Sequence, residues 1–185
     1  MRPVVVTATL LLVALMVISV SAAWNPKASC EAKYPPVPCK IKINNEEWWQ
    51  MGPNRCAKAY HNVPPLSFND AEKACQEARH GNFRGYLVSI RDIVELNQAV
   101  CIMYREHTGQ PHYWIGLRVV MDVIHGMGYR WTDGSKFSFS RWAPDQPDYF
   151  MFSEDCVEMN YSEWALWNDE SCDAKRPYMC AMNIY

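Results

Sequence analysis

The sequence lacks the short motifs that mark the common classes of enzyme. It contains no GxSxG nucleophile motif, no HExxH zinc motif and no phosphate-binding P-loop. The carboxylates of Asp148 and Glu154 could imitate the acid pair with which a glycosidase cleaves sugars. Both residues also belong to a metal-ligand pattern described below. We therefore expect a binding protein and not an enzyme.

A strong net charge and a second long apolar run are also missing. The chain of 185 residues has a formal net charge of −2, which gives no electrostatic reason to expect binding to nucleic acid or to an anionic membrane. The one long apolar run, Val4–Val20, follows Arg2 and precedes the small residues 21–23. This order is typical of a secretory signal peptide over 1–23, although a membrane anchor is the alternative. We expect a secreted, extracellular protein without membrane insertion after cleavage.

Zinc-type cysteine spacing is absent as well. The chain has eight cysteines, and none of them forms a CxxC pair. An even number of cysteines behind a signal peptide favours disulfides over a zinc site. Four bridges could be connected in about a hundred ways, so spacing alone does not select the pairs.

The rest of the chain is predicted to form one domain, 39–185, behind a proline-rich lead-in, 24–38. The lead-in is expected to be extended, because each proline removes a backbone donor. Ser67 is a suitable N-cap for a first helix, and a second helix is predicted from Arg91 to His107. Short aromatic and β-branched runs then predict strands at Tyr113–Leu117, Tyr129–Thr132, Cys156–Met159 and Tyr178–Met182. Early helices and later strands favour an α+β fold.

Oxygen-bearing side chains cluster between residues 146 and 169. Carboxylates and side-chain amides occur there in three groups: Gln146-Pro147-Asp148, Glu154-Asp155-Cys156 and Trp167-Asn168-Asp169. Hard cations such as Ca²⁺ bind about 6–8 oxygen ligands of these types. The first group alone could be an ordinary turn, since proline and aspartate favour turns. The three groups together predict calcium binding.

The order of these motifs resembles that of the C-type lectin-like family. The resemblance covers about residues 39–182 and rests on a series of short pieces. They are Leu66–Cys75, Leu87–Ile90, Trp114–Leu117, Trp131–Ser135, Trp142, the three oxygen-rich groups, and Cys172 with Cys180. The resemblance implies a C-type lectin-like fold, in which two helices pack on short antiparallel sheets beside a long calcium-binding loop region, with disulfide bonds.

The resemblance also implies how the cysteines pair. The implied bridges are Cys75–Cys180 and Cys156–Cys172, with Cys39–Cys56 closing an N-terminal hairpin. Cys30 and Cys101 remain. They could pair with each other or stay free, or Cys30 could cross-link two chains. We expect a homo-oligomer, because one shallow sugar site binds weakly and avidity multiplies its affinity.

Calcium-dependent members of the family hold a sugar-binding ion with five residues. The matching positions in this chain are Gln146, Asp148, Glu154, Asn168 and Asp169. The resemblance implies that these side chains bind one Ca²⁺, which coordinates two hydroxyls of a sugar. It also implies a cis peptide bond before Pro147.

The order of amide and acid in Gln146-Pro147-Asp148 is similar to that of galactose-type sites. Tyr149, Phe150 or the nearby Phe152 could stack on the apolar face of such a sugar. The chain lacks the glycine-rich loop of the best galactose binders, so the implied ligand is a galactose-type or related glycan. The expected partners are glycans or glycoproteins. The alternative is a lectin-like module that binds a protein, a mineral or an ice surface.

One further motif bears on modification. Asn160-Tyr161-Ser162 is a sequon for N-glycosylation. On a secreted chain it predicts a glycan at Asn160, although such a tripeptide also occurs frequently by chance.

Overall fold

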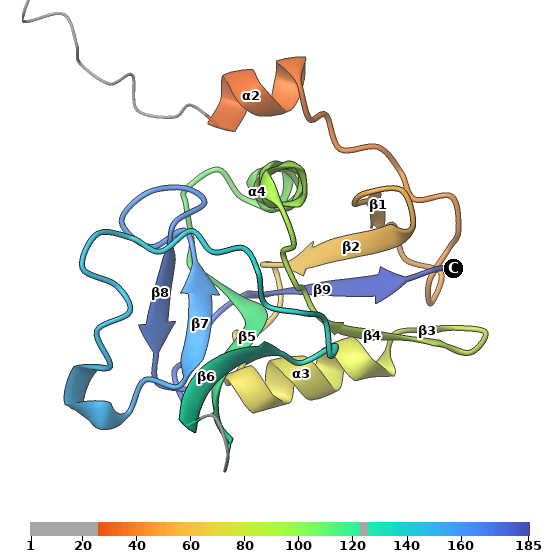
Figure 1. Ribbon diagram of the computed structural model, residues 1–185. Helices are drawn as coiled ribbons and strands as arrows, with labels where there is room; N and C mark the ends of the chain where they lie inside the picture. The colour runs from red at the N-terminus through yellow and green to blue at the C-terminus, as the bar shows by residue number, and fades with distance from the viewer. Residues whose placement is uncertain (1–25, 123–125) are drawn as a thin grey trace, which may run out of the picture.

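The computed structural model describes residues 26–122 and 126–185, so the predicted signal peptide lies outside the described residues. The described helices are α2 (Pro26–Ala32), α3 (Phe68–Glu77), α4 (Ile93–Glu106) and the 3₁₀ helix η1 (Phe150–Phe152). The described strands are β1 (Trp49–Gln50), β2 (Arg55–Tyr60), β3 (Arg79–His80), β4 (Phe83–Leu87), β5 (Tyr113–Asp122), β6 (Gly126–Trp131), β7 (Cys156–Met159), β8 (Trp167–Glu170) and β9 (Tyr178–Asn183). Figure 1 shows the arrangement, which confirms the α+β class.

The strands form one connected sheet. Its order is β1-β2-β9-β5-β7-β8, with β4 also paired to β9, β3 to β4 and β6 to β5. All these pairs are antiparallel except β5 with β9, which run parallel where Trp114 meets Tyr178. The sheet is therefore mixed at this junction and not purely antiparallel. No hairpin joins these two distant strands, so their relative direction is not constrained by a tight turn.

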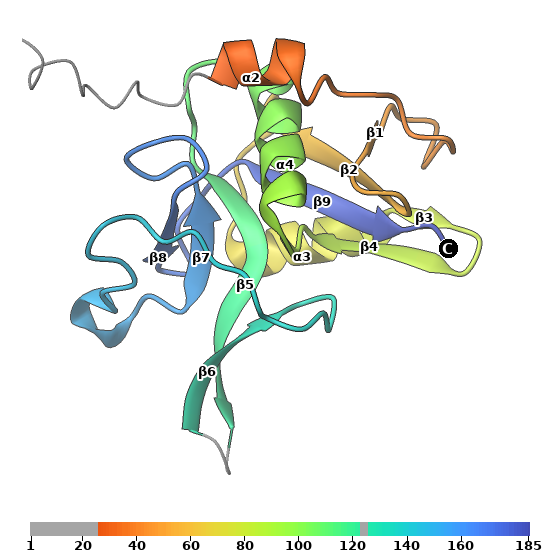
Figure 2. The same ribbon diagram turned by 45° about the horizontal axis from the view of Figure 1, so that its top comes forward.

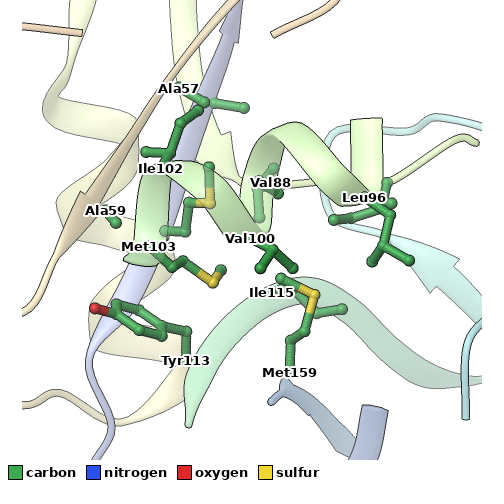
Figure 3. Packing of buried hydrophobic residues seen from close by; sticks show 14 of the residues in the cluster. Ala57, Ala59, Val88, Leu96, Val100, Ile102, Met103, Tyr113, Ile115 and Met159 are labelled. Carbon is green, nitrogen blue, oxygen red and sulfur yellow. The ribbon is translucent and has the colours of Figure 1, made fainter. Parts of the chain in front are cut away.

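Two apolar clusters lie on opposite faces of β2 and β9. Successive side chains of a strand point to opposite faces, so Ala57 and Ala59 pack toward α4 while Cys56 packs toward α3. Figures 1 and 2 show these two strands between the two helices. Figure 3 shows side chains of α4, including Val100 and Met103, in the first cluster. Each fully buried apolar side chain of this size contributes about 1.5–3 kcal/mol.

Polar caps set the beginnings of the two longer helices. Ser67 Oγ accepts from Asp70 N at 3.3 Å, which confirms Ser67 as the N-cap of α3. For α4 the cap is Asp92, whose Oδ1 accepts from Glu95 N at 2.8 Å. The predicted second helix was therefore slightly too long at its start, because Arg91 precedes the cap.

The glycine in the Trp114–Leu117 motif has a structural cause. Gly116 N donates to Val88 O at 2.8 Å, and Gly116 O accepts from Thr132 N at the same distance. A Cβ at this position would lie 2.5 Å from Leu87 O. Only glycine therefore lets β5 pass so close to the backbone that follows β4.

Four disulfides join the elements. The pairs are Cys30–Cys101, Cys39–Cys56, Cys75–Cys180 and Cys156–Cys172, and all eight cysteines lie in the described part of the chain. The last three are the pairs that the family resemblance implied. Cys75–Cys180 ties α3 to β9, and Cys156–Cys172 ties the start of β7 to the turn after β8. A native disulfide contributes about 2–4 kcal/mol.

The proline-rich lead-in is not wholly extended. Residues Pro26–Ala32 form α2, because proline is tolerated in the first turn of a helix, where its missing N–H has no partner to lose. The Cys30–Cys101 bridge then fixes α2 against α4, with Cys30 buried. Of the alternatives left open for Cys30, the structure thus has the pairing with Cys101 and not a cross-link between two chains.

No helix within the described residues combines the length and apolar character needed to cross a bilayer. The longest of them, α4, has 14 residues, whereas a spanning helix needs about 20.

Candidate metal centre

The middle of the long loop, residues 132–155, pairs with the outer edge of β8. Trp167 N donates to Arg141 O at 2.8 Å, and Trp167 O accepts from Ala143 N at 2.9 Å. Alternate residues of a strand direct their backbone groups to the same edge. The carbonyl of Asp169 therefore points to this edge too, where the loop continues beyond Ala143.

A buried polar network holds the start of the long loop. Arg55 Nη1 donates to Glu95 Oε2 at 3.0 Å, and Arg55 Nη2 donates to Ser89 Oγ at 2.9 Å. Ser89 Oγ in turn donates to Asp133 Oδ2 at 2.5 Å. The side chains of Arg55 and Glu95 are only 2% and 5% exposed. The network thus links β2 and α4 to the segment that leads into the site.

Tryptophan side chains pack against one another where the long loop meets β8. Trp167 is fully buried, and its ring contacts those of Trp131 and Trp142 edge to face, with centroids 5.9 Å apart in both pairs. Edge-to-face aromatic pairs contribute about 0.5–1.5 kcal/mol beyond the area they bury. This packing fixes β8 and the loop against the core, as expected for a tryptophan directly before Asn168 and Asp169.

Three of the five predicted ligands are carboxylates, and the structure brings them together. Oxygens of Asp148, Glu154 and Asp169 all lie within 4.8 Å of one another. Asp169 is buried, and its two oxygens accept from Asp148 N at 3.1 Å and from Tyr149 N at 2.9 Å. Phe150 N donates to Asp148 Oδ1 at 3.1 Å and to Glu154 Oε2 at 3.0 Å. Backbone N–H groups thus hold the cluster together despite the repulsion of three like charges.

Gln146 supplies a fourth oxygen at the same loop. The Gln146–Pro147 peptide bond is cis. Gln146 Oε1 is buried and has no hydrogen-bond partner among the described residues. A buried acceptor without a partner costs about 1–3 kcal/mol. A cation beside the carboxylates would give this oxygen a partner, so the donor set fits a hard metal ion.

The fifth predicted ligand, Asn168, lies on β8, which the sequence analysis did not identify as a strand. Its Nδ2 donates to Glu158 Oε1 at 3.2 Å, on the face of the strand opposite to the Asp169 side chain.

Glu158 was also missed as a site-related residue. It accepts from His112 Nδ1 at 2.9 Å and from Arg176 Nε at 2.6 Å. The sequence does contain one signal for the role of Glu158. This glutamate stands within the apolar run Cys156–Met159, and a buried charge needs partners.

The electrostatics of the cluster are unfavourable without a cation. Partial burial raises the pKa of Glu154, and the negative charges of Asp169 and Glu170 raise it further, to about 7. The hydrogen bond from Phe150 N opposes this shift. Burial and the neighbouring negative charges thus both favour the protonated form of Glu154 when no cation is bound.

The three aromatic residues proposed for stacking differ in exposure. Tyr149 is half-buried, and its ring stacks on that of Tyr129 with centroids 6.4 Å apart. Phe150 and Phe152 are 59% and 98% exposed. The backbone N–H groups of Tyr149 and Phe150 both donate to carboxylates of the cluster. Of the two exposed aromatic residues, Phe150 is therefore the one whose backbone is hydrogen-bonded to the cluster.

The sequon asparagine is part of the core. Asn160 is fully buried, its Nδ2 donates to Pro111 O at 3.2 Å, and its Oδ1 accepts from Ala165 N at 3.1 Å. Nδ2 is the atom that N-glycosylation modifies. The folded chain therefore gives no access to it, and the structure opposes the expectation of a glycan at Asn160.

Comparison with known proteins gives a consistent result. A family model described as "Lectin C-type domain" matches residues 64–182. The "C-type lectin galactose-binding isoform" of Pseudechis porphyriacus is 38% identical over 126 residues, which cover 68% of this chain and 75% of that protein. The crystal structure of the C-type lectin CEL-I from Cucumaria echinata matches with a TM-score of 0.64 at 26% identity, covering 80% of this chain and 99% of that one.

The fold is also shared more widely. Herring type II antifreeze protein matches with a TM-score of 0.56 at 23% identity, covering 80% of this chain and all of that chain. At this identity the likeness concerns the fold alone. The family model, in contrast, covers more than half of the chain, and its match includes every residue of the cluster. The chain therefore belongs to the C-type lectin domain family.

Proposed function

We propose that this protein is a secreted, calcium-dependent lectin, which binds a galactose-type or related glycan through one Ca²⁺. The observation that carries the proposal is the clustering of the carboxylates of Asp148, Glu154 and Asp169, in a loop region where the buried oxygen of Gln146 also has no hydrogen-bond partner among the described residues. Carboxylate and amide oxygens are the ligands that Ca²⁺ prefers. Within this proposal, residues 1–23 are a signal peptide, 24–38 the lead-in and 39–185 the lectin domain.

The edge of β8 is the proposed location of the ion. The carbonyl of Asp169 points to this edge, and the side chains of Asn168 and Asp169 leave the strand on its two faces. An ion beside the edge is within reach of both. With Gln146, Asp148 and Glu154 the chain offers about six oxygens, which leaves about two positions for sugar hydroxyls in an eight-coordinate ion.

The chemistry of the ligands suits a pair of adjacent hydroxyls. Each hydroxyl can bind the ion, donate to a carboxylate and accept from a side-chain amide. The order of amide and acid, Gln146 before Asp148, supports a galactose-type ligand, and the relative from Pseudechis porphyriacus is described as galactose-binding. Phe150 is the proposed platform for the apolar face of the sugar, because it is exposed beside the carboxylates.

A galactose-agarose column tests this function directly. We expect the purified protein to be retained in millimolar calcium and to elute with EDTA or with free galactose, because the metal forms part of the binding surface. Retention that neither EDTA nor free sugar reverses would contradict the proposal and would favour the alternative, a module for a protein, mineral or ice surface.

Calcium affinity should fall as the pH is lowered through about 7. The proton on Glu154 competes with the ion, so below the pKa of about 7 each pH unit should weaken calcium binding about tenfold. At pH 7 binding should release about half a proton per ion, measurable by calorimetry in buffers with different ionisation enthalpies. The Glu154→Gln variant is the control and should show weaker binding without this release. Equal heats in all buffers for the wild type would contradict the assignment.

The same raised pKa predicts how calcium and pH act on stability. Because the folded pKa of Glu154 lies above its unfolded value, the ion-free protein binds this proton more tightly when folded. Its contribution to stability is present at low pH and is lost as the pH rises through about 7. Calcium should therefore raise the melting temperature more at pH 8 than at pH 5.5.

Exchanging the amide and the acid should change the sugar that is preferred. In Gln146→Glu with Asp148→Asn, the donor and acceptor positions at one end of the sugar are reversed. We expect the ratio of galactose to mannose affinity to fall about tenfold or more, since hydrogen bonds to charged groups contribute about 1.5–3 kcal/mol. Competition for the column by the two free sugars measures this ratio. The exposed neighbour Asp145 supplies the control, because Asp145→Asn should leave the ratio unchanged.

A further inference from the structure

Glu158 is a buried carboxylate whose contacts lead to the proposed calcium site. Its side chain is 1% exposed and lies on β7, directly opposite Asn168 of β8. Oε2 accepts from Arg176 Nε at 2.6 Å, while Oε1 accepts from His112 Nδ1 at 2.9 Å and from Asn168 Nδ2 at 3.2 Å. Arg176 Nη2 also donates to Glu170 Oε2. Arg176 and His112 thus fix the carboxylate of Glu158, which also accepts from the amide of Asn168.

These contacts leave Asn168 one orientation. The carboxylate of Glu158 is an acceptor at both oxygens, so the amide atom facing it must be Nδ2, which is a donor. Asn168 Oδ1, on the other side of the amide, is then directed away from Glu158. A terminal amide torsion is otherwise broad and twofold, so the amide has little orientation of its own.

We infer that Glu158 is a positioning residue, which fixes the amide of Asn168 so that Oδ1 faces the calcium ion and the second N–H of Nδ2 is left for the sugar. The inference rests on the proposed function, in which Asn168 is a calcium ligand. Partners that orient a metal ligand in this way typically change metal affinity by about 10–100-fold when they are lost.

In the variant Glu158→Gln, residue 158 would present a donor to Asn168 in place of an acceptor. Arg176 can only donate, so the new carboxamide must turn its oxygen toward Arg176 and its nitrogen toward Asn168. Two donors would then face each other. Asn168 should respond by rotating Oδ1 toward residue 158 and away from the ion. We expect calcium affinity to fall about 10–100-fold.

The variant Asn168→Asp should also bind calcium more weakly, because two acceptors would then face each other. It adds a negative charge beside the ion, which by ligand charge alone should strengthen calcium binding. The added carboxylate would face the carboxylate of Glu158, and like charges at this distance repel. We therefore expect weaker calcium binding, by about tenfold or more.

Combining the two substitutions should restore binding. In the double variant, the amide nitrogen at position 158 donates to one carboxylate oxygen at position 168, and the other oxygen faces the ion. Calorimetric titration with CaCl₂ at pH 8, where Glu154 is ionised, should then give an affinity within about threefold of wild type. A merely structural role for Glu158 provides no reason for such recovery. Glu46→Gln is the control, since Glu46 also pairs with a basic side chain, that of Lys58, but belongs to the segment before β1 and not to the carboxylate cluster.

The outcomes separate the inference from the function on which it rests. If wild-type protein takes up no calcium at millimolar concentration, the proposed function fails. If wild type binds calcium but the single variants bind equally well, or the double variant does not recover, only the role of Glu158 is overturned. If Glu158→Gln does not fold, as judged by its melting curve in EDTA, Asn168→Asp decides alone: weaker binding supports the inference, and equal or stronger binding overturns it.

Discussion

Replacing Asp169 with asparagine should abolish calcium binding at micromolar concentration and lower the affinity about 100-fold or more. The substitution removes one negative charge from a cluster that attracts the cation. It also places an NH₂ group opposite Asp148 N or Tyr149 N, both of which donate to the native carboxylate. Hydrogen bonds to charged groups contribute about 1.5–3 kcal/mol each. Loss of the ligand and loss of the loop conformation therefore reinforce each other.

Calorimetric titration at pH 8 measures this effect while Glu154 is ionised. The matched control is Asp155→Asn. Asp155 carries the same charge one residue after Glu154, but it is exposed and lies outside the cluster of three carboxylates. Its replacement should change calcium affinity less than threefold, through long-range charge alone. If Asp155→Asn and Asp169→Asn weakened binding equally, general electrostatic attraction and not a defined site would explain calcium uptake.

Elements whose residues interact with near neighbours could be predicted from the sequence. The cap at Ser67 uses Asp70, three residues away, and β7 has the predicted bounds Cys156–Met159. In such cases the local pattern contains both partners of the stabilising contact. The family resemblance added what local patterns do not contain, namely which distant segments meet.

Elements that depend on distant partners escaped the sequence analysis. α2 has only 7 residues, and helices this short are marginal on their own, but its bridge from Cys30 to Cys101 fixes it. β8 consists largely of polar residues with low strand propensity. It forms because β7 pairs with one of its edges and residues 141–143 with the other.

The candidate site shows the same division. The carboxylates could be named from the sequence through the resemblance, whereas their distances depend on a loop closed by contacts over 20 residues, such as Tyr149 N to Asp169. The roles of Glu158 and Asn160 depend on burial, which no local pattern specifies. A buried carboxylate has to be paired and a buried amide has to be bonded. The contacts of both residues therefore follow from their burial and could not be predicted from their sequence neighbours.

The second large effect concerns stability. Replacing Glu95 with alanine should lower the free energy of unfolding by about 3–5 kcal/mol, because it leaves the buried guanidinium of Arg55 without its main counter-charge. Burial already lowers the pKa of Arg55, and Glu95 opposes that shift. Burial raises the pKa of Glu95, but its contacts with Arg91 and Arg55 outweigh burial and leave the pKa below its usual value. The contribution of Glu95 is therefore present above its unfolded pKa and is lost as the pH falls through its folded pKa.

Thermal and denaturant unfolding of two further variants identify the cause. Combining Arg55→Met with Glu95→Leu removes both charges and should cost less than Glu95→Ala alone, because the damage comes from the unpaired charge. Lys175→Ala breaks a 3.7 Å ion pair with Asp70 in which both side chains are more than half exposed, so it should have little effect. An equally large loss for the double substitution would show that Arg55 and Glu95 stabilise by their hydrogen bonds to the backbone and to Ser89. In that case the network would act chiefly by holding the start of the long loop, and calcium affinity would fall together with stability.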